Sequence, residues 1–235
     1  MNQKSLSKVV IITGSGRGIG KAAALMFGQR GYKVVILART RNEIKETGEE
    51  VRKFGGPDTS GLVMQTDVRK LTDIRKLVAA TLKKWGRIDI LINNAAVAYC
   101  GSFDEQTASQ QQEMVETNVR GLVDFIREVR PVMAKQGSGI IVNVASRAGH
   151  AGRQRYSVYS ATKAAVINIT SGLAPGFVEE GIKMFCLCPK GTATKMFFDC
   201  NPGAIPDDQP EDVAKVMVEM VEQPDRYTIG DHFDL

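Results

Sequence analysis

The alternation of two kinds of segment constrains the fold of this chain more than any other feature. Short runs of aliphatic and β-branched residues alternate with amphipathic stretches from one end to the other. Strands that are apolar on both faces must be covered on both sides, and their alternation with helices is typical of parallel pairing. The pattern predicts an α/β fold, a doubly wound parallel sheet of about seven strands with helices on both faces. The predicted strands are Lys8–Thr13, Lys33–Ala38, Leu62–Thr66, Asp89–Ile92, Gly139–Val144, Lys183–Cys188 and a weaker one near Tyr227–Phe233, and the helices lie at about 18–30, 41–54, 71–85, 107–135, 156–180 and 210–222.

The chain shows neither an internal repeat nor a low-complexity linker, and 235 residues suit one well-buried α/β domain. We therefore expect residues 1–235 to form a single domain. One long irregular segment, Pro189–Gln209, is rich in glycine, proline, asparagine and aspartate. Because a loop of this length in a compact domain is usually functional, we expect a substrate lid within residues 189–210.

Charge, cysteines and the first residues bear on the surroundings of the protein. The net charge of +5 is modest and the basic residues are spread out, which argues against nucleic-acid binding. No apolar run could span a bilayer, and Met1–Lys8 lacks the apolar region of a signal peptide. We expect a cytoplasmic protein with no membrane partner. The cysteines form no C-x-x-C pair and only two histidines accompany them, so we expect no metal site and reduced structural thiols at Cys100, Cys186, Cys188 and Cys200.

A glycine-rich loop joins the first predicted strand to the first predicted helix, and it reads Thr13-Gly14-Ser15-Gly16-Arg17-Gly18-Ile19-Gly20. Glycines there allow a tight turn, a close approach of the backbone to a pyrophosphate, and close packing of the helix on the strand. The phosphates would bind the free N–H groups of the helix N-terminus. The loop predicts a Rossmann-type dinucleotide-binding fold, with cofactor contacts at Gly14, Ser15, Gly16, Arg17, Gly18, Ile19 and Gly20.

The end of the second predicted strand distinguishes between the two dinucleotides. NAD sites normally carry an acidic residue about 20 positions past the glycines, bonded to the ribose 2′-OH. Here the segment reads Leu37-Ala38-Arg39-Thr40-Arg41, without a carboxylate. An arginine fork binds a 2′-phosphate in a bidentate manner, and Arg17 could supply a second cation. We therefore expect NADP(H) as the cofactor, held at this end by Arg39, Thr40 and Arg17.

A tyrosine and a lysine, Tyr159 and Lys163, stand four residues apart on one face of a predicted helix. A phenol has a pKa of about 10 and is a poor base at neutral pH, but a nearby cation lowers that pKa. An alcohol that loses hydride to a nicotinamide needs such a group as a base, and a carbonyl that gains hydride needs it as an acid. Ser146 ends the fifth predicted strand, at the sheet edge where ligands bind. The three residues predict a catalytic site.

These residues together resemble the short-chain dehydrogenase/reductase family, in its short single-domain branch. The resemblance covers nearly the whole chain, and its motifs stand in the correct order: the glycine loop, Asp67-Val68, Asn93-Asn94-Ala95-Ala96, Asn118, Ser146, Tyr159 with Lys163, and Pro189 with Thr194. The resemblance implies an oxidoreductase that interconverts a carbonyl and a secondary alcohol of a small molecule by hydride transfer with NADP(H).

The resemblance also implies a role for each matching residue. Tyr159 would be the general acid/base, and Ser146 would hydrogen-bond the substrate oxygen. Lys163 would bond the nicotinamide ribose and lower the pKa of Tyr159, while Asn118 would hold a water molecule in the proton relay. The other implied cofactor contacts are Asp67 and Val68 at the adenine, Asn93 beside the ribose, Ala95, and Pro189 and Thr194 at the carboxamide.

The chain departs from the family pattern at two positions. Ala96 stands where the asparagine motif usually ends in glycine, and Lys190 stands where glycine usually follows the proline. Both put the local turn geometry in doubt, though not the class of cofactor. Tyr156 is not expected to be catalytic because the residue four positions on is a serine. The side chains expected to face the substrate are Val97, His150, Arg153, Tyr156 and, from the lid, Met196, Phe197 and Phe198.

Several alternatives remain at this stage. A reductase of 3-oxoacyl groups on acyl carrier protein is one, since a positively charged chain could meet an acidic carrier. A non-catalytic NADP(H)-sensing or scaffold protein is another, although such a protein is expected to lose part of the Asn118, Ser146, Tyr159 and Lys163 set. An RNA or DNA binder would need clustered basic and aromatic residues. The resemblance further implies a homodimer or homotetramer, assembled through the helices at 107–135 and 156–180.

Overall fold

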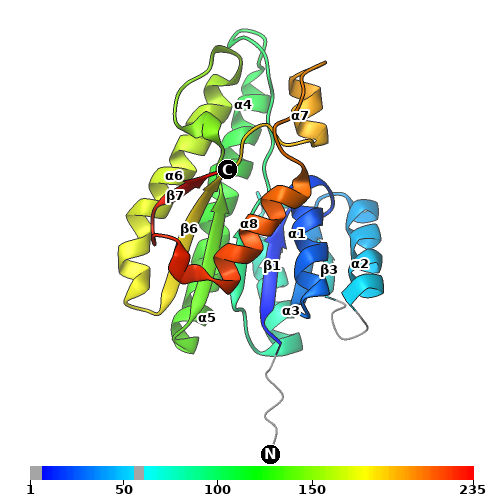
Figure 1. The fold of residues 1–235 in the computed structure, drawn as a ribbon, viewed down its shortest axis with the longest axis vertical. Coiled ribbons are helices and arrows are strands. Elements are labelled where there is room, and N and C mark those ends of the chain that lie inside the picture. Colours follow the sequence, from blue (N-terminus) through cyan, green and yellow to red (C-terminus); the bar gives the residue numbers. More distant parts are fainter. Residues whose placement is uncertain (1–6, 56–60) are drawn as a thin grey trace, which may run out of the picture.

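The computed structural model describes residues 7–55 and 61–235, and in this part of the chain seven parallel strands form one sheet (Figure 1). The order of the strands is β3-β2-β1-β4-β5-β6-β7, so the direction of winding reverses between β1 and β4. Open α/β sheets bind ligands at such a reversal, outside the carboxyl ends of the strands. The predicted α/β fold is confirmed. The strands are β1 Val9–Thr13, β2 Lys33–Ala38, β3 Leu62–Gln65, β4 Ile90–Asn93, β5 Gly139–Val144, β6 Ile182–Cys188 and β7 His232–Asp234.

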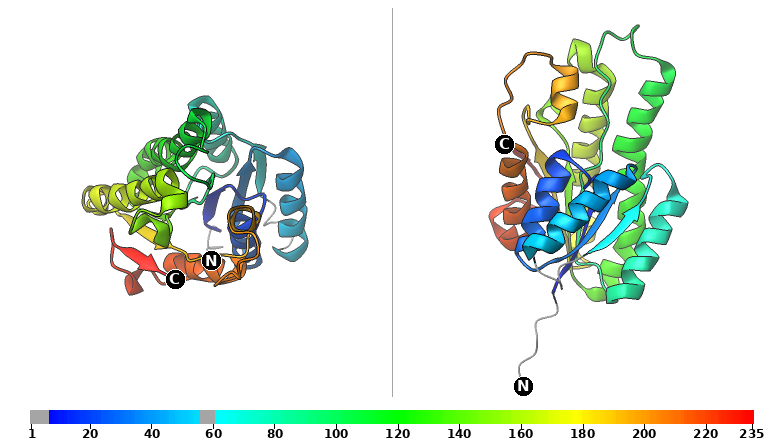
Figure 2. Two further views of the ribbon diagram at one scale, coloured as in Figure 1. Left: turned by 90° about the horizontal axis from the view of Figure 1, so that it is seen from above. Right: turned by 90° about the vertical axis from the view of Figure 1, so that its right-hand side faces the viewer.

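Helices cover both faces of the sheet, as the view from above in Figure 2 shows. The reason lies in the strands, since Val9 and Ile11 of β1 belong to one apolar core while Val10 and Ile12 belong to the other. Complete burial of a side chain of this size contributes roughly 1.5–3 kcal/mol, so each face requires a helical layer. The helices are α1 Gly18–Gln29, α2 Arg41–Gly55 and α8 Pro210–Glu222 on one face, α3 Leu71–Trp85, α4 Ala108–Val115, α5 Gly121–Gln136 and α6 Ser157–Val178 toward the other, and the short α7 Lys195–Cys200.

Three elements differ from the sequence prediction. The helix expected at 107–135 is interrupted by a π-helical turn, η2 Glu116–Arg120, between α4 and α5. The segment expected to be irregular contains α7, which begins there because the Thr194 side chain accepts a hydrogen bond from the Phe197 N–H. The last strand is shorter than expected, because a 3-10 turn, η5 Pro224–Arg226, and the left-handed Gly230 precede it. Two more 3-10 turns, η3 Arg147–Gly149 and η4 Gln154–Tyr156, lie before α6.

None of the helices in residues 7–55 and 61–235 combines the length and the apolar character that crossing a membrane requires. The expectation of an unexported chain drew on the first residues of the sequence, and residues 1–6 lie outside the described part.

Candidate active site

A cavity of about 590 Å³ lies at the carboxyl edge of the sheet, lined by the segments that follow β1, β2, β3, β4, β5 and β6. The predicted cofactor-binding loop and the predicted catalytic residues meet there, because the cavity wall includes both the glycine loop and the Tyr159 side chain. Most of the predicted site residues line it: Gly14, Gly16, Arg17, Gly18, Ile19, Arg39, Thr40, Val68, Ala95, Val97, Ser146, Tyr156, Tyr159, Lys163, Pro189 and Thr194.

The glycine loop packs too closely for side chains at two of its positions. Gly14 adopts a left-handed φ of 66°, and a Cβ there would meet the Ala95 backbone at 2.9 Å. A Cβ on Gly20 would lie 2.3 Å from the Gly14 carbonyl oxygen, so only glycine lets α1 start this close to the loop. No side chain caps the N-terminus of α1. Its first N–H groups are therefore available to an anion, as the phosphate-loop interpretation requires.

Thr13 and Asn94 join the glycine loop to the segment after β4. The Thr13 hydroxyl accepts hydrogen bonds of 2.9 Å from the N–H groups of both Asn94 and Ala95, and the Asn94 amide donates to the Thr13 carbonyl oxygen at 2.9 Å. Asn94 lines the cavity, whereas the predicted contact Asn93 is buried beneath it and donates to Asn143 of the neighbouring strand at 2.9 Å. Asn94 is thus the asparagine whose side chain faces the cavity, and the predicted cofactor contact of Asn93 stays a prediction. The alternation of side chains along β4 was the signal, since Asn93 still belongs to the strand and lies level with Asn143.

Ser146, Tyr159 and Lys163 meet at the floor of the cavity. Ser146 stands in extended backbone directly after β5, where its Oγ accepts a hydrogen bond from the Ala148 N–H at 3.1 Å. Tyr159 and Lys163 lie on successive turns of α6, with the Lys163 Nζ 5.8 Å from the centre of the tyrosine ring. That ammonium group is buried and donates to the Val144 carbonyl oxygen at 2.8 Å.

Burial dominates the ionisation of this pair. It raises the pKa of Tyr159 to about 12, against a smaller lowering by the hydrogen bond with Ser146. It also lowers the pKa of Lys163 to about 8. In the protein alone, desolvation disfavours both charged forms and so outweighs the lowering of the Tyr159 pKa that the resemblance implies for Lys163, whose ammonium donates to a carbonyl oxygen. The buried phenol is held in its protonated form.

Asn118 lies in the π-helical turn and does not line the cavity. Its amide clamps the backbone after β4, accepting from the Val97 N–H at 2.8 Å and donating to the Val97 carbonyl oxygen at 2.9 Å. It also donates to the Thr162 hydroxyl on α6 at 3.1 Å. The side chain of Asn118 therefore positions a cavity wall and connects that wall to the helix of Tyr159. The water-holding role that the resemblance implies stays a prediction.

Both arginines expected at the 2′ end of the nucleotide are paired with carboxylates. Arg39, at the end of β2, bonds Glu113 of α4, and Arg17 lies 3.4 Å from Glu43 of α2. Tyr99 donates a 2.6 Å hydrogen bond to Glu113 and so holds the pKa of that carboxyl below its usual range. Glu43 lines the cavity, and sequence reasoning missed it because it looked for an acid only at the end of the strand.

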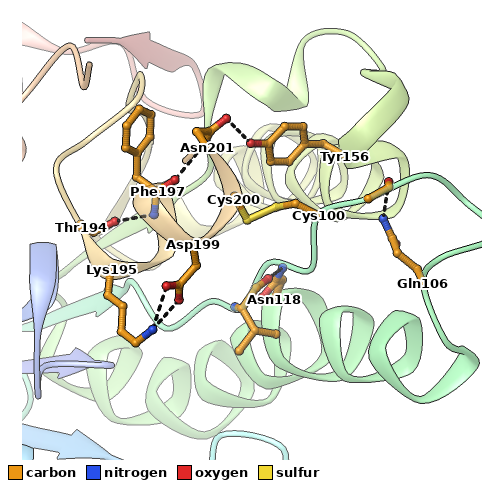
Figure 3. The surroundings of a disulfide bond; sticks show 12 residues. Cys100, Gln106, Asn118, Tyr156, Thr194, Lys195, Phe197, Asp199, Cys200 and Asn201 are labelled. Carbon is orange, nitrogen blue, oxygen red and sulfur yellow. Dashed lines mark hydrogen bonds and ion pairs between the residues drawn. A yellow bond between two sulfur atoms is a disulfide. The ribbon is translucent and has the colours of Figure 1, made fainter. Parts of the chain in front are cut away.

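The segment 189–210, in which we expect a lid, is joined to the segment after β4 by a disulfide between Cys100 and Cys200, shown in Figure 3. Cys100 follows β4, and Cys200 ends α7 and lines the cavity. A second link lies beside it, where the Tyr156 hydroxyl donates to the Asn201 side chain at 2.6 Å. The prediction of four reduced thiols is wrong for this pair, because the fold brings their Cα atoms to 5.4 Å. Cys186 and Cys188 are free and buried, as expected.

Five other predicted residues lie outside the cavity wall. Ser15 and Gly20 are covered by the glycine loop and α1, and Ser15 bonds the backbone of Leu37. The Asp67 carboxylate is held by Arg69 at 2.7 Å, so its neighbours Thr66 and Val68 face the cavity in its place. His150 points to the sheet edge, where its Nε2 lies 2.7 Å from Asp234. Phe198 is half-exposed on the outside of α7, while Met196, Phe197 and Arg153 do line the cavity.

Comparison with known proteins agrees with this geometry. Residues 8–204 match the family model described as short chain dehydrogenase. An uncharacterised oxidoreductase of Thermotoga maritima is 38% identical over 214 residues, which are 91% of this chain and 82% of the relative. A solved structure of actinorhodin polyketide ketoreductase with NADPH superimposes with a TM-score of 0.89 at 26% identity, covering 97% of this chain and 95% of that one. A 3-ketoacyl-(acyl-carrier-protein) reductase from Brucella melitensis, solved with NADH, gives 0.87 at 28% identity over 98% of both chains. The chain belongs to the short-chain dehydrogenase family of oxidoreductases.

Proposed function

We propose that the protein reduces the carbonyl group of a small molecule to a secondary alcohol with a nicotinamide dinucleotide, preferentially NADPH. One observation carries the proposal: Ser146, Tyr159 and Lys163 converge on the floor of a cavity whose far wall is an uncapped glycine loop. A dinucleotide bound by its phosphates at the N-terminus of α1 would lead toward these three residues. The cofactor would supply or accept the hydride, and the side chains of the protein would handle the proton.

Tyr159 is the proton donor in this proposal. Burial keeps its proton in place, with a pKa of about 12, so the phenol is ready to donate to a carbonyl oxygen at neutral pH. Ser146 lines the same cavity as Tyr159, and its hydroxyl would orient the same carbonyl oxygen. In its protonated state the phenol can act as the acid that reduction of a carbonyl requires.

Lys163 is the second charged group of the mechanism. Its buried ammonium has one carbonyl partner, at Val144, although an ammonium carries three donors. The remaining donors would bind the hydroxyls of the nicotinamide ribose. A bound ribose would then give the ammonium polar partners and keep it charged, which favours loss of the Tyr159 proton in the transition state.

The preference for NADPH rests on the balance of charge at the 2′ end of the site. Arg17 and Arg39 line the cavity and are half-exposed or more, so both can turn to a phosphate. Glu43 and Glu113 oppose them, and Glu43 could instead accept a hydrogen bond from the 2′-OH of NADH. The two solved relatives hold different dinucleotides, NADPH in the ketoreductase and NADH in the Brucella enzyme. We propose NADPH because each carboxylate is already paired with an arginine.

The substrate would enter between the segment after β4 and the lid, which we propose to be residues 189–210 of a single catalytic domain. Val97, Tyr156, Met196 and Phe197 line that side of the cavity. A 3-oxoacyl thioester is the second candidate, favoured by the likeness to the Brucella reductase and by the exposed cations Arg147 and Arg153 at the cavity. Those cations would meet an acidic carrier or a phosphorylated thiol arm.

The experiment that tests the proposal is a substrate panel with the purified protein. Aldehydes, ketones, keto-sugars and 3-oxoacyl thioesters would each be mixed with NADPH or NADH, and the loss of nicotinamide absorbance would be followed. We expect oxidation of NADPH with at least one class of carbonyl. Failure of every member with both dinucleotides, in a protein that binds NADPH, would favour a sensor or scaffold instead.

We also propose a symmetric homo-oligomer built on the outer faces of α5 and α6. Small residues lie on the exposed side of α6, among them Ala161, Asn168 and Gly172. Small side chains let helices approach closely across a two-fold axis. Light scattering at micromolar concentration should give a dimer or tetramer mass, and a clean monomer would contradict the proposal.

A further inference from the structure

The fold brings together the only two histidines of the chain. His150 follows the turn after β5, and His232 opens β7 at the edge of the sheet. Strand β6 separates the two strands in the sheet, yet the imidazole centres lie 4.8 Å apart. Nothing in the sequence pattern predicts this meeting, since the two residues belong to different elements and neither lies in a metal-binding motif.

A carboxylate completes the cluster. Asp234 lies two positions after His232, and side chains two apart in a strand project from the same face. Its Oδ1 is 2.7 Å from the His150 Nε2. One donor atom from each of His150, His232 and Asp234 falls within a span of 4.8 Å. The three side chains are 32–45% exposed, so they can adjust and an ion could reach them.

A second carboxylate, that of Asp231, lies beside one ring nitrogen of His232. This carboxylate lies 3.3 Å from the His232 Nδ1. A histidine that binds a metal through one ring nitrogen commonly donates the other N–H to a carboxylate, which sets the tautomer and makes the ligating nitrogen more basic. The same Asp231 oxygen accepts a 2.7 Å hydrogen bond from the His232 backbone N–H, and a rotation of the imidazole would let it also accept from the Nδ1 while the Nε2 binds the ion.

We propose that His150, His232 and Asp234 form a site for a divalent transition metal, with zinc the best match. Two imidazole nitrogens and one carboxylate oxygen are a donor set typical of zinc, with bonds of about 2.0–2.2 Å. Bonds of that length at tetrahedral angles put two donor atoms about 3.4 Å apart. The 2.7 Å contact between His150 and Asp234 must therefore open by roughly half an ångström or more, while the widest separation in the cluster, up to 4.8 Å, must close. Solvent fills the remaining position, because the cluster is exposed.

The site would tie the edge of the sheet to the catalytic loop. The turn that carries His150 begins at Ser146, and Gly149 within it packs so closely on α6 that a Cβ would lie 2.8 Å from the Lys163 backbone. Strand β7 is only three residues long and pairs with β6 alone. An ion shared by His150 and β7 therefore joins the shortest strand of the sheet to the loop that holds Ser146.

The test uses the full chain, prepared without a histidine tag and freed of metal with a chelator that is then removed. Zn²⁺ would be titrated calorimetrically, and Co²⁺ would report the ligands by its visible absorption. We expect one Zn²⁺ per chain with a dissociation constant below about 10 μM, Co²⁺ bands without sulfur charge transfer, and a melting temperature several degrees higher with the ion.

Variants separate this site from adventitious binding. His150→Gln, His232→Gln and Asp234→Asn should each weaken Zn²⁺ binding by at least about tenfold, while Asp231→Asn should weaken it less. Asp225→Asn, on an exposed carboxylate of the same region that pairs with Lys183, is the matched control and should bind as the wild type does. Absence of binding at about 1 mM Zn²⁺, or equal affinity in the His150→Gln/His232→Gln double variant, would overturn the site and leave an ion pair.

Discussion

The two halves of the cavity are built by different means. On the glycine-loop side, β1, α1 and β2 approach each other through backbone, and a single added Cβ at Gly20 would collide at 2.3 Å. On the lid side, the segment 189–210 is held through side chains, by the disulfide from Cys200 to Cys100 of the segment after β4 and by the hydrogen bond from Tyr156 of η4 to Asn201. Backbone packing leaves little room for variation. Side-chain contacts between exposed segments can be exchanged without disturbing the sheet, which suits the half of the site that selects the substrate.

The sharpest test of this comparison removes the one proton that the chemistry needs. Tyr159→Phe keeps the ring and its packing but deletes the hydroxyl, so folding and NADPH binding should survive while kcat falls by about 10²–10⁴-fold. Steady-state kinetics on any substrate found by the panel would measure the loss.

Tyr156→Phe is the matched control because it removes a hydroxyl of the lid half. It breaks the bond to Asn201 and should raise KM while leaving most of kcat. Comparable turnover in Tyr159→Phe and the wild type would refute the assignment of the proton donor.

The next largest effect is expected on removal of the disulfide, which belongs to the lid half of the cavity alone. The double variant Cys100→Ser/Cys200→Ser should lose about 2–4 kcal/mol of unfolding free energy. It should raise the KM for the substrate more than it weakens NADPH binding, because the two cysteines lie outside the glycine loop. Thermal melts with and without a reductant measure the contribution of the disulfide to stability: the reductant should lower the melting temperature of the wild type and leave that of the double variant unchanged. If four thiols react in the unreduced, denatured wild type, the bond does not form.

Within the nucleotide half, the paired arginines and glutamates at the 2′ end are expected to set the choice between NADPH and NADH. Arg39→Asp should shift preference from NADPH toward NADH by roughly ten- to hundred-fold, since a charge-assisted hydrogen bond is worth about 1.5–3 kcal/mol. Glu43→Gln should act in the opposite direction, because it frees Arg17 and removes a carboxylate from the cavity. Fluorescence titration with both dinucleotides would measure the ratio of their dissociation constants. If neither substitution alters that ratio, these residues do not set the cofactor preference.

The smallest effect concerns pH. Burial lowers the pKa of Lys163 to about 8, so in the free protein the ammonium loses its proton as the pH rises past 8, and NADPH affinity should fall by at most about tenfold per pH unit. The unfolded chain keeps that proton up to its ordinary pKa of 10.5. The unfolded state therefore binds more protons between pH 8 and 10.5, and the contribution of Lys163 to stability rises in this window.

Lys163→Met tests whether Lys163 causes both the fall in NADPH affinity and the rise in stability with pH, or whether other titrating groups cause them. This substitution should abolish both the fall in NADPH affinity and the rise in stability between pH 8 and 10.5. Thermal melts and fluorescence titrations at matched pH would measure the two slopes, and unchanged slopes in the variant would assign them to other groups.

The sequence by itself determined what depends on local spacing. Alternating apolar runs required a sheet covered on both faces, the glycines between β1 and α1 marked the close approach there, and the four-residue interval from Tyr159 to Lys163 put both on one side of α6. Tertiary structure decided what depends on the path of the chain between distant elements. It paired Cys100 with Cys200, turned Asn94 rather than Asn93 to the cavity, set Glu43 and Glu113 against the arginines, and brought His150 to His232. Local periodicity specifies the face on which a side chain lies, but only packing specifies which far residue lies opposite it.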